Sequence, residues 1–167
     1  MEQAQLIASP QGEELGTLGL SGLKLTLRLC YLNFAVYLAV YVTGMYINIY
    51  ITSGVNTIGI SDPTNMIHMI GATVNFAISF IVMMVGILYG MRKVALFSLG
   101  ALISLVVATI GGLLFLATGG ARQSGSVTLV GGWIMSLLFM LALFLSYYAT
   151  LRIMRATRVL EVLGKVQ

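Results

Sequence analysis

Charged residues are missing from four long stretches of this 167-residue chain. The stretches are 29–52, 67–90, 94–117 and 127–151, and none contains Asp, Glu, Lys or Arg. Intramembrane ion pairs, charge relays and carboxylate chemistry need these residue types, so the sequence excludes such chemistry from most of the chain. Charged residues form only 8% of the sequence, whereas a soluble domain has about 25%.

Cysteine and proline are scarce as well. Cys30 is the only cysteine, which excludes an internal disulfide and a cysteine-based zinc site. The two prolines, Pro10 and Pro63, lie outside the four stretches, so no span shows the interruption that is typical of carriers. No phosphate-binding loop, dinucleotide fingerprint or metal-ligand spacing is present, so no metal site is expected.

The four stretches are long and hydrophobic. Each stretch exceeds the roughly 20 residues with which a helix crosses the hydrocarbon core of a bilayer. Because backbone groups in lipid must be bonded within the segment, helices are the expected form. The sequence therefore predicts an all-α, polytopic membrane protein: an antiparallel four-helix transmembrane bundle over residues 29–151. Residues 1–28 are expected to form a polar tail and juxtamembrane segment. Residues 152–167 are expected to form a basic amphipathic extension on the inner leaflet.

The basic residues lie almost entirely in three segments. Eight of the nine Lys and Arg precede the first stretch, separate the second from the third, or follow the fourth. With four spans these segments share one side of the membrane. The positive-inside rule then predicts a plasma-membrane protein with both termini in the cytoplasm. The net charge of +4 is explained by this topology, and no nucleic-acid binding is expected.

Small and polar residues recur at helical spacing within the stretches. Lipid is apolar, so membrane helices associate through close packing and through hydrogen bonds between helices, and such stripes predict the bundle interior. In the last stretch the stripe is Gly132, Ser136 and Met140. In the first two stretches the stripes are Asn33, Tyr37, Tyr41, Gly44 and Asn48, and His68, Ala72, Asn75, Ser79, Met83, Gly86 and Gly90. The hydroxyls of Tyr37 and Tyr41 are expected to find partners near Asn75 and Ser79.

His68 is the only histidine and lies in the first turns of the second predicted helix, which Asp62 and Pro63 are expected to start. An ionisable residue at membrane depth raises a functional hypothesis, and three interpretations stay open. His68 packs or caps a helix, bonded to Asn48 or a loop carbonyl; it binds haem or quinone; or it handles protons.

A haem held by two histidines cannot be built by one copy of this chain. A His–Met pair is chemically feasible, with Met45 or Met135 at similar depth. Dimerisation would also bring two copies of His68 together. Asn48 and Asn75 are the other expected neighbours of a cofactor, although the sequence requires neither haem nor quinone.

The second predicted helix resembles that of compact, four-helix haem A synthases. The stretch Asn65-Met-Ile-His68-Met-Ile-Gly-Ala72 is similar to the segment in which that family places a helix-opening histidine, and Ala108-Thr-Ile-Gly-Gly112 is similar to its small-residue helix. The resemblance implies haem-linked redox chemistry. The sequence has Asn65 where the family has an acid, and Gly131-Gly132-Trp133 where it has a second histidine. Gly44-Met-Tyr-Ile-Asn48 with His68 also resembles small, uncharacterised four-helix membrane proteins of archaea and bacteria.

Three functions follow. The first is a non-catalytic accessory or scaffold protein that packs against other membrane-protein subunits, for example of a respiratory complex, or that self-associates. The missing charges and the small-residue stripes favour it. The second is a haem- or quinone-linked redox protein that uses His68. The third is a small carrier or channel, for which Asn75 and Ser79 are the only candidate midplane residues on the second helix.

Overall fold

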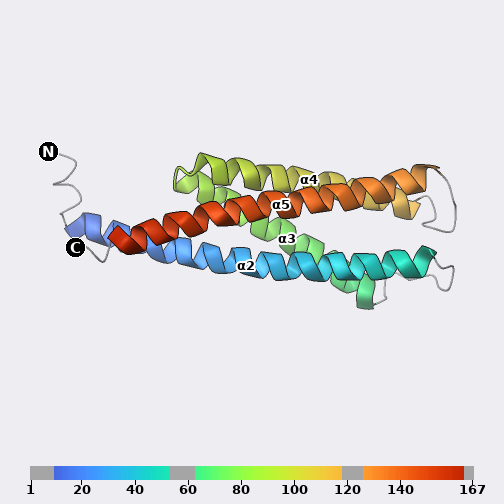
Figure 1. The fold of residues 1–167 in the computed structure, drawn as a ribbon, viewed down its shortest axis with the longest axis horizontal. Helices are drawn as coiled ribbons and strands as arrows, with labels where there is room; N and C mark the ends of the chain where they lie inside the picture. Colours follow the sequence, from blue (N-terminus) through green and yellow to red (C-terminus); the bar gives the residue numbers. More distant parts are fainter. Residues whose placement is uncertain (1–9, 53–62, 118–125, 164–167) are drawn as a thin grey trace.

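Four long helices make up the computed structural model, which describes residues 10–52, 63–117 and 126–163. They are α2 (Pro10–Thr52), α3 (Pro63–Leu88), α4 (Arg92–Ala117) and α5 (Ser126–Leu163). Consecutive helices run in opposite directions, and the described part of the chain contains no strand (Figure 1). The all-α class is confirmed, and the arrangement is compatible with a four-helix bundle.

Each helix contains a segment long and apolar enough to cross a membrane. These segments are Gly19–Ile47, Pro63–Leu88, Arg92–Leu114 and Val130–Leu163. Two of the helices are much longer than the predicted stretches, because α2 starts at Pro10 and α5 runs to Leu163. The N-terminal residues from Pro10 onward, expected in a polar tail, are therefore helical. The start of α3 at Pro63 agrees with the prediction, whereas Asp62 lies outside the described residues.

A three-residue turn joins α3 to α4. Gly90 adopts a φ of 65°, and the N–H groups of Gly90 and Met91 donate to the carbonyls of Ile87 (3.1 Å) and Gly86 (2.7 Å). This pair of bonds is a Schellman cap, in which a glycine takes the left-handed conformation at low cost. The turn makes α3 and α4 a tight antiparallel hairpin. At Gly86 an added Cβ would lie 2.6 Å from the backbone nitrogen of Ala95, so the two helices approach closely there.

The α4–α5 interface is the most extensive contact between helices. Along α4, buried small and branched residues recur every three or four positions: Val94, Ser98, Ala101, Leu105 and Ala108. Ala142 and Ala149 are buried on α5. Near the far end, a Cβ on Gly111 would lie 3.0 Å from the carbonyl oxygen of Gly131. Small residues therefore let the two backbones come close.

The face of α5 that packs inward differs from the predicted one. Gly131 and Ala142 are buried, whereas Ser136 and Met140 are exposed and Gly132 is half-buried. The expected stripe of Gly132, Ser136 and Met140 is thus wrong as a description of the bundle interior. Small residues occupy adjacent positions on this helix, and one residue turns the inward direction by about 100°.

The core continues along the C-terminal half of α5. Ile153 is fully buried in a cluster with Leu23 and Cys30 of α2 and Val82 of α3. Thr157 is buried one turn later. This part of α5 therefore runs beside α2 as a continuation of the bundle (Figure 1).

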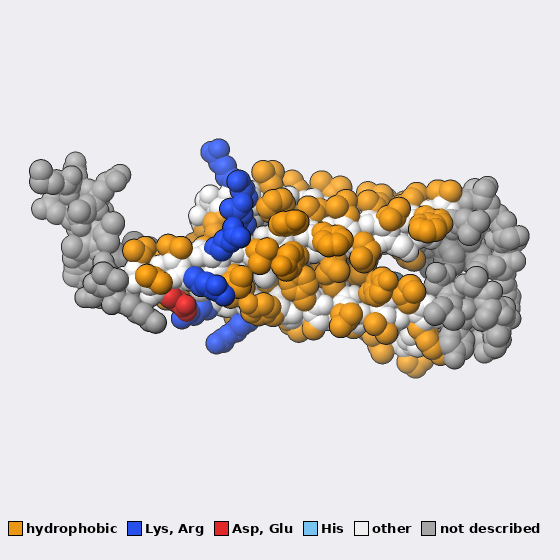
Figure 2. Space-filling view, in the orientation of Figure 1, with side chains coloured by type: hydrophobic (Ala, Val, Ile, Leu, Met, Phe, Trp, Pro, Cys, Tyr) orange, Lys and Arg blue, Asp and Glu red, His pale blue; other side chains and the backbone are white. Residues whose placement is uncertain are grey.

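Basic side chains gather in one band toward the end of the molecule where α2 begins and α5 ends, and the two helices continue past this band (Figure 2). Exposed hydrophobic side chains cover the visible surface beyond this band. The described Lys and Arg are Lys24, Arg28, Arg92, Lys93, Arg152, Arg155 and Arg158. The fold therefore brings the three basic segments of the sequence to the same end of the helices.

Candidate functional site

His68 lies between α2 and α3, where it makes a hydrogen bond across the interface. Its Nδ1 is 2.9 Å from the backbone carbonyl oxygen of Val40 and 3.4 Å from the hydroxyl oxygen of Thr43. A carbonyl oxygen can only accept, so Nδ1 carries the proton, and in the neutral ring Nε2 keeps its lone pair. The histidine side chain therefore ties the start of α3 to the backbone of α2.

Glycine on α2 makes room for the imidazole ring. A Cβ on Gly44 would lie 2.9 Å from Cε1 of His68. One turn along α3, the glycine is on α3 and the side chain is on α2: a Cβ on Gly71 would collide with Cγ2 of Val40. The ring and the valine thus interlock with glycines of the opposite helix. Of the three interpretations left by the sequence, this geometry is compatible with a packing residue, for which the carbonyl of Val40 is the bonding partner.

The other predicted cofactor neighbours are spread over the bundle. Met45 is exposed. Met135 lies against α4, where its sulfur would be 3.2 Å from a Cβ on Gly112. Asn75 is fully buried roughly two turns along α3 from His68, and the side chain of Asn48 lies outside the described residues. Among the described residues, no three His, Cys, Asp or Glu side chains come together as metal ligands.

A second group of polar side chains is buried in the middle of the bundle. The hydroxyls of Tyr37 and Ser146 are 3.4 Å apart and link α2 to α5. The Ser79 hydroxyl lies near that of Tyr37 but outside hydrogen-bond geometry, and the amide of Asn75 has no partner either. Tyr41 is 43% exposed. The Tyr37 hydroxyl thus lies near Ser79, as expected, but its hydrogen-bond partner is Ser146 of α5. The prediction that Tyr41 lies inside the bundle is wrong.

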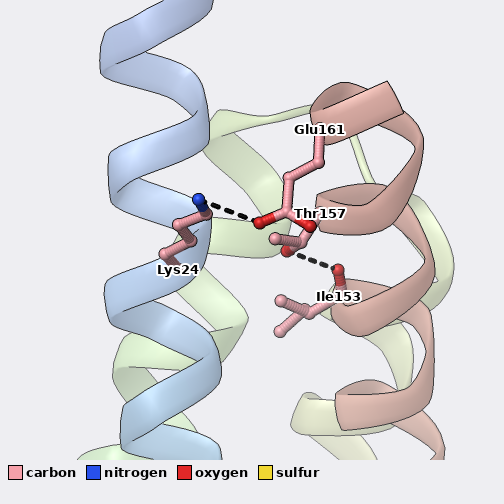
Figure 3. A network of polar contacts seen from close by, with 4 residues as sticks. All are labelled: Lys24, Ile153, Thr157 and Glu161. Carbon is pink, nitrogen blue, oxygen red and sulfur yellow. Dashed lines mark hydrogen bonds and ion pairs between the residues drawn. The ribbon is translucent and has the colours of Figure 1, made fainter. Parts of the chain in front are cut away.

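A third candidate region lies in the basic band, between α2 and α5. Nζ of Lys24 is 2.9 Å from Oε1 of Glu161, and both side chains are about half-exposed (Figure 3). A pocket of about 270 Å³ lies beside this ion pair. No sequence pattern indicates this pocket, because its two walls come from opposite ends of the chain and no local spacing connects them.

Comparisons with protein-family models, curated proteins and solved structures each found no match to this chain. The resemblance to haem A synthases thus stays a prediction, which is tested through the chemistry of His68.

Proposed function

We propose that the protein is a multi-pass integral protein of the plasma membrane, with both termini in the cytoplasm, and that it serves as a non-catalytic accessory or scaffold subunit. It would pack against other membrane-protein subunits, or against a second copy of itself. The four apolar helices and the basic band at one end support the membrane placement.

The non-catalytic part of this proposal is supported by the hydrogen bond that His68 makes. His68 is the strongest candidate for chemistry within the four membrane-crossing segments, and its Nδ1 is engaged with the backbone of α2. The hydroxyls of Thr43, Thr73, Thr109 and Thr150 donate to carbonyls of their own helices. Polar groups that serve helix packing and backbone bonding are those of a structural bundle.

The outward face of α5 is the surface that the proposal assigns to a partner. Ser136 is exposed there, one turn from Gly132 and one turn from Met140. Small and polar residues at this spacing let a further membrane helix approach closely, whereas lipid does not require them. The large side chains of Trp133 and Leu137 flank them and are 66% and 62% exposed.

Native mass measurement in mild detergent tests this function. We expect the protein to travel with a second copy or with another membrane subunit, and Ser136→Leu to release that partner by blocking close approach. Ala77→Leu is the matched control, because Ala77 is exposed on α3 and away from this face. A wild-type protein that is monomeric and alone under conditions that preserve membrane complexes would contradict the proposal.

The orientation is tested separately by cysteine labelling. In a Cys30→Ala background, a cysteine at position 124 should react with a membrane-impermeant reagent only from outside the cell. Labelling from the cytoplasmic side would reverse the proposed topology without changing the scaffold role.

A haem- or quinone-linked role for His68 is the second candidate function. It is favoured by one observation: Nδ1 donates to a carbonyl, which leaves Nε2 with the lone pair that a ligating histidine uses. If this function is correct, the purified protein shows a Soret band, or contains quinone, and His68→Ala removes it. A colourless, quinone-free protein rules it out.

A further inference from the structure

The pocket in the basic band has one wall from each of the two longest helices. Its volume is about 270 Å³. From α2 it is lined by Lys24, Leu27, Arg28 and Tyr31, and from α5 by Met154, Thr157, Arg158 and Glu161. Figure 3 shows Lys24 and Glu161 facing each other from these two helices. We call this pocket the α2–α5 groove.

Positive charge is in excess in the α2–α5 groove. Three cationic side chains line it against the single carboxylate of Glu161, which pairs with Lys24 at 2.9 Å. The guanidinium of Arg158 donates to the sulfur of Met154 at 3.8 Å, and a thioether is a weak acceptor. Within the described part of the chain, neither Arg28 nor Arg158 has an ion-pair partner. Two guanidinium groups are thus available to an anion.

Apolar and aromatic surface adjoins this charge. Tyr31 is 53% exposed, and its hydroxyl lies 3.9 Å from the sulfur of Met154. One turn nearer the middle of the bundle, Phe34 of α2 meets Tyr147 of α5 edge to face, with ring centroids 6.1 Å apart. A ligand in the groove therefore meets cations at one end and a hydrocarbon-compatible surface at the other.

We propose that the α2–α5 groove binds the phosphate of an anionic phospholipid. Arg28 and Arg158 donate to the phosphate oxygens, which suit the planar, two-pronged geometry of a guanidinium. The acyl chains run past Tyr31 toward Phe34. Basic pockets between membrane helices bind anionic headgroups in this way. The inference rests on the membrane placement proposed above and adds a ligand to it.

Glu161 gives the groove a preference among phosphates. Its carboxylate holds Lys24 and repels further negative charge, so a phosphodiester with one negative charge fits better than a phosphomonoester with up to two. Phosphatidylglycerol is the matching probe, and phosphatidylcholine is its neutral counterpart.

Lipid titration followed by native mass spectrometry of the full chain in a neutral detergent tests the proposal. We expect adducts with phosphatidylglycerol at concentrations where phosphatidylcholine leaves none. The double variant Arg28→Gln/Arg158→Gln should weaken binding about tenfold or more, since each basic side chain near a headgroup contributes substantially. Arg92→Gln/Lys93→Gln is the matched control: it removes the same charge from the same band at the start of α4, outside the groove, and should change binding less than about twofold.

Glu161→Gln supplies an opposite expectation, because removing the carboxylate should strengthen phosphatidylglycerol binding. Misfolding cannot produce such a gain. Equal losses in the two double variants, or equal binding of the two lipids, would overturn the proposal.

Glycerol 3-phosphate is added as a competitor to separate the sources of phosphate. Displacement of the lipid at equal concentration would assign the groove to a soluble phosphate and overturn the lipid assignment. Failure of lipid binding is distinguishable from failure of the scaffold function, because the native mass of the assembly and the labelling at position 124 are measured independently.

Discussion

The α4–α5 and α2–α3 helix pairs are held together by different means. Between α4 and α5 the backbones approach through small residues, down to 3.0 Å between a Cβ on Gly111 and the carbonyl oxygen of Gly131. Between α2 and α3 the glycines accommodate side chains, and His68 adds a hydrogen bond to the Val40 carbonyl. The difference indicates that close approach of the backbones characterises the α4–α5 interface, whereas the α2–α3 interface adds a hydrogen bond from a side chain to the opposite backbone.

Gly111→Ala should weaken the α4–α5 interface, and we expect it to have the largest effect on stability. The added methyl meets the backbone atoms Gly131 O at 3.0 Å and Met135 N at 3.1 Å, so the α5 backbone must give by a few tenths of an ångström. We expect unfolding in mixed micelles with rising dodecyl sulfate to show a loss of about 1–3 kcal/mol.

Gly112→Ala is the control for that substitution. It meets only the mobile thioether of Met135, at 3.2 Å, and should be neutral or slightly stabilising. Equal losses at both positions would show that the backbone contact is not what limits the approach of α4 to α5.

Asn75→Leu should reduce the contrast, because it replaces a buried polar side chain of α3 with an apolar one. The Asn75 amide is fully buried, with no partner for either of its polar atoms. Leucine has a similar size and no polar atoms that need hydrogen bonds. The substitution should therefore raise the free energy of unfolding by about 1 kcal/mol. Thr73→Val, exposed on the same helix, should have almost no effect. A clear destabilisation by Asn75→Leu alone would mean that the amide has a partner in the folded protein.

His68→Phe should weaken the α2–α3 interface less than Gly111→Ala weakens its counterpart. The phenyl ring keeps the volume over Gly44 and loses the bond to Val40. Hydrogen bonds between membrane helices contribute about 0.6 kcal/mol on average, and the same unfolding titration should show a loss of that order. Thr43→Val, which removes only the 3.4 Å contact with His68 and bonds within α2, should cost less. If Thr43→Val lowered the free energy of unfolding more than His68→Phe does, the His68–Val40 bond would not be the main polar contact between α2 and α3.

Glu161→Gln should have the smallest effect on stability. The Lys24–Glu161 pair is half-exposed on both sides, and exposed pairs contribute about 0.2–1 kcal/mol, less at high salt. The thermal midpoint should fall slightly at low salt and be unchanged at high salt. A large, salt-independent fall would show that the ends of α2 and α5 depend on this pair.

The helices and their order could be predicted from the sequence, because uninterrupted hydrophobic length and Pro63 leave few alternatives. Which face of α5 packs inward could not be predicted, since Gly131 and Gly132 are adjacent and both are small. The packing of Ile153 and Thr157 against α2 was hidden by the neighbouring arginines, which suggested a surface segment.

The candidate site was predicted in part. His68 stands out in the sequence because it is the only histidine and lies in a segment without charge. Its partner could not be predicted, because every residue has a backbone carbonyl and the sequence does not show that the carbonyl of Val40 is the acceptor. The α2–α5 groove depends on contacts between the two ends of the chain, which local patterns do not reveal.

Nitrogen-15 NMR of the reconstituted protein labelled at histidine tests the central claim, that His68 serves helix packing through its Nδ1. The single histidine gives one assignable pair of ring signals. The structure predicts a diamagnetic spectrum with Nδ1 protonated and hydrogen-bonded and Nε2 bare, and His68→Phe should remove both signals without changing the fold. A proton on Nε2, or the signature of a metal bound there, would contradict the account.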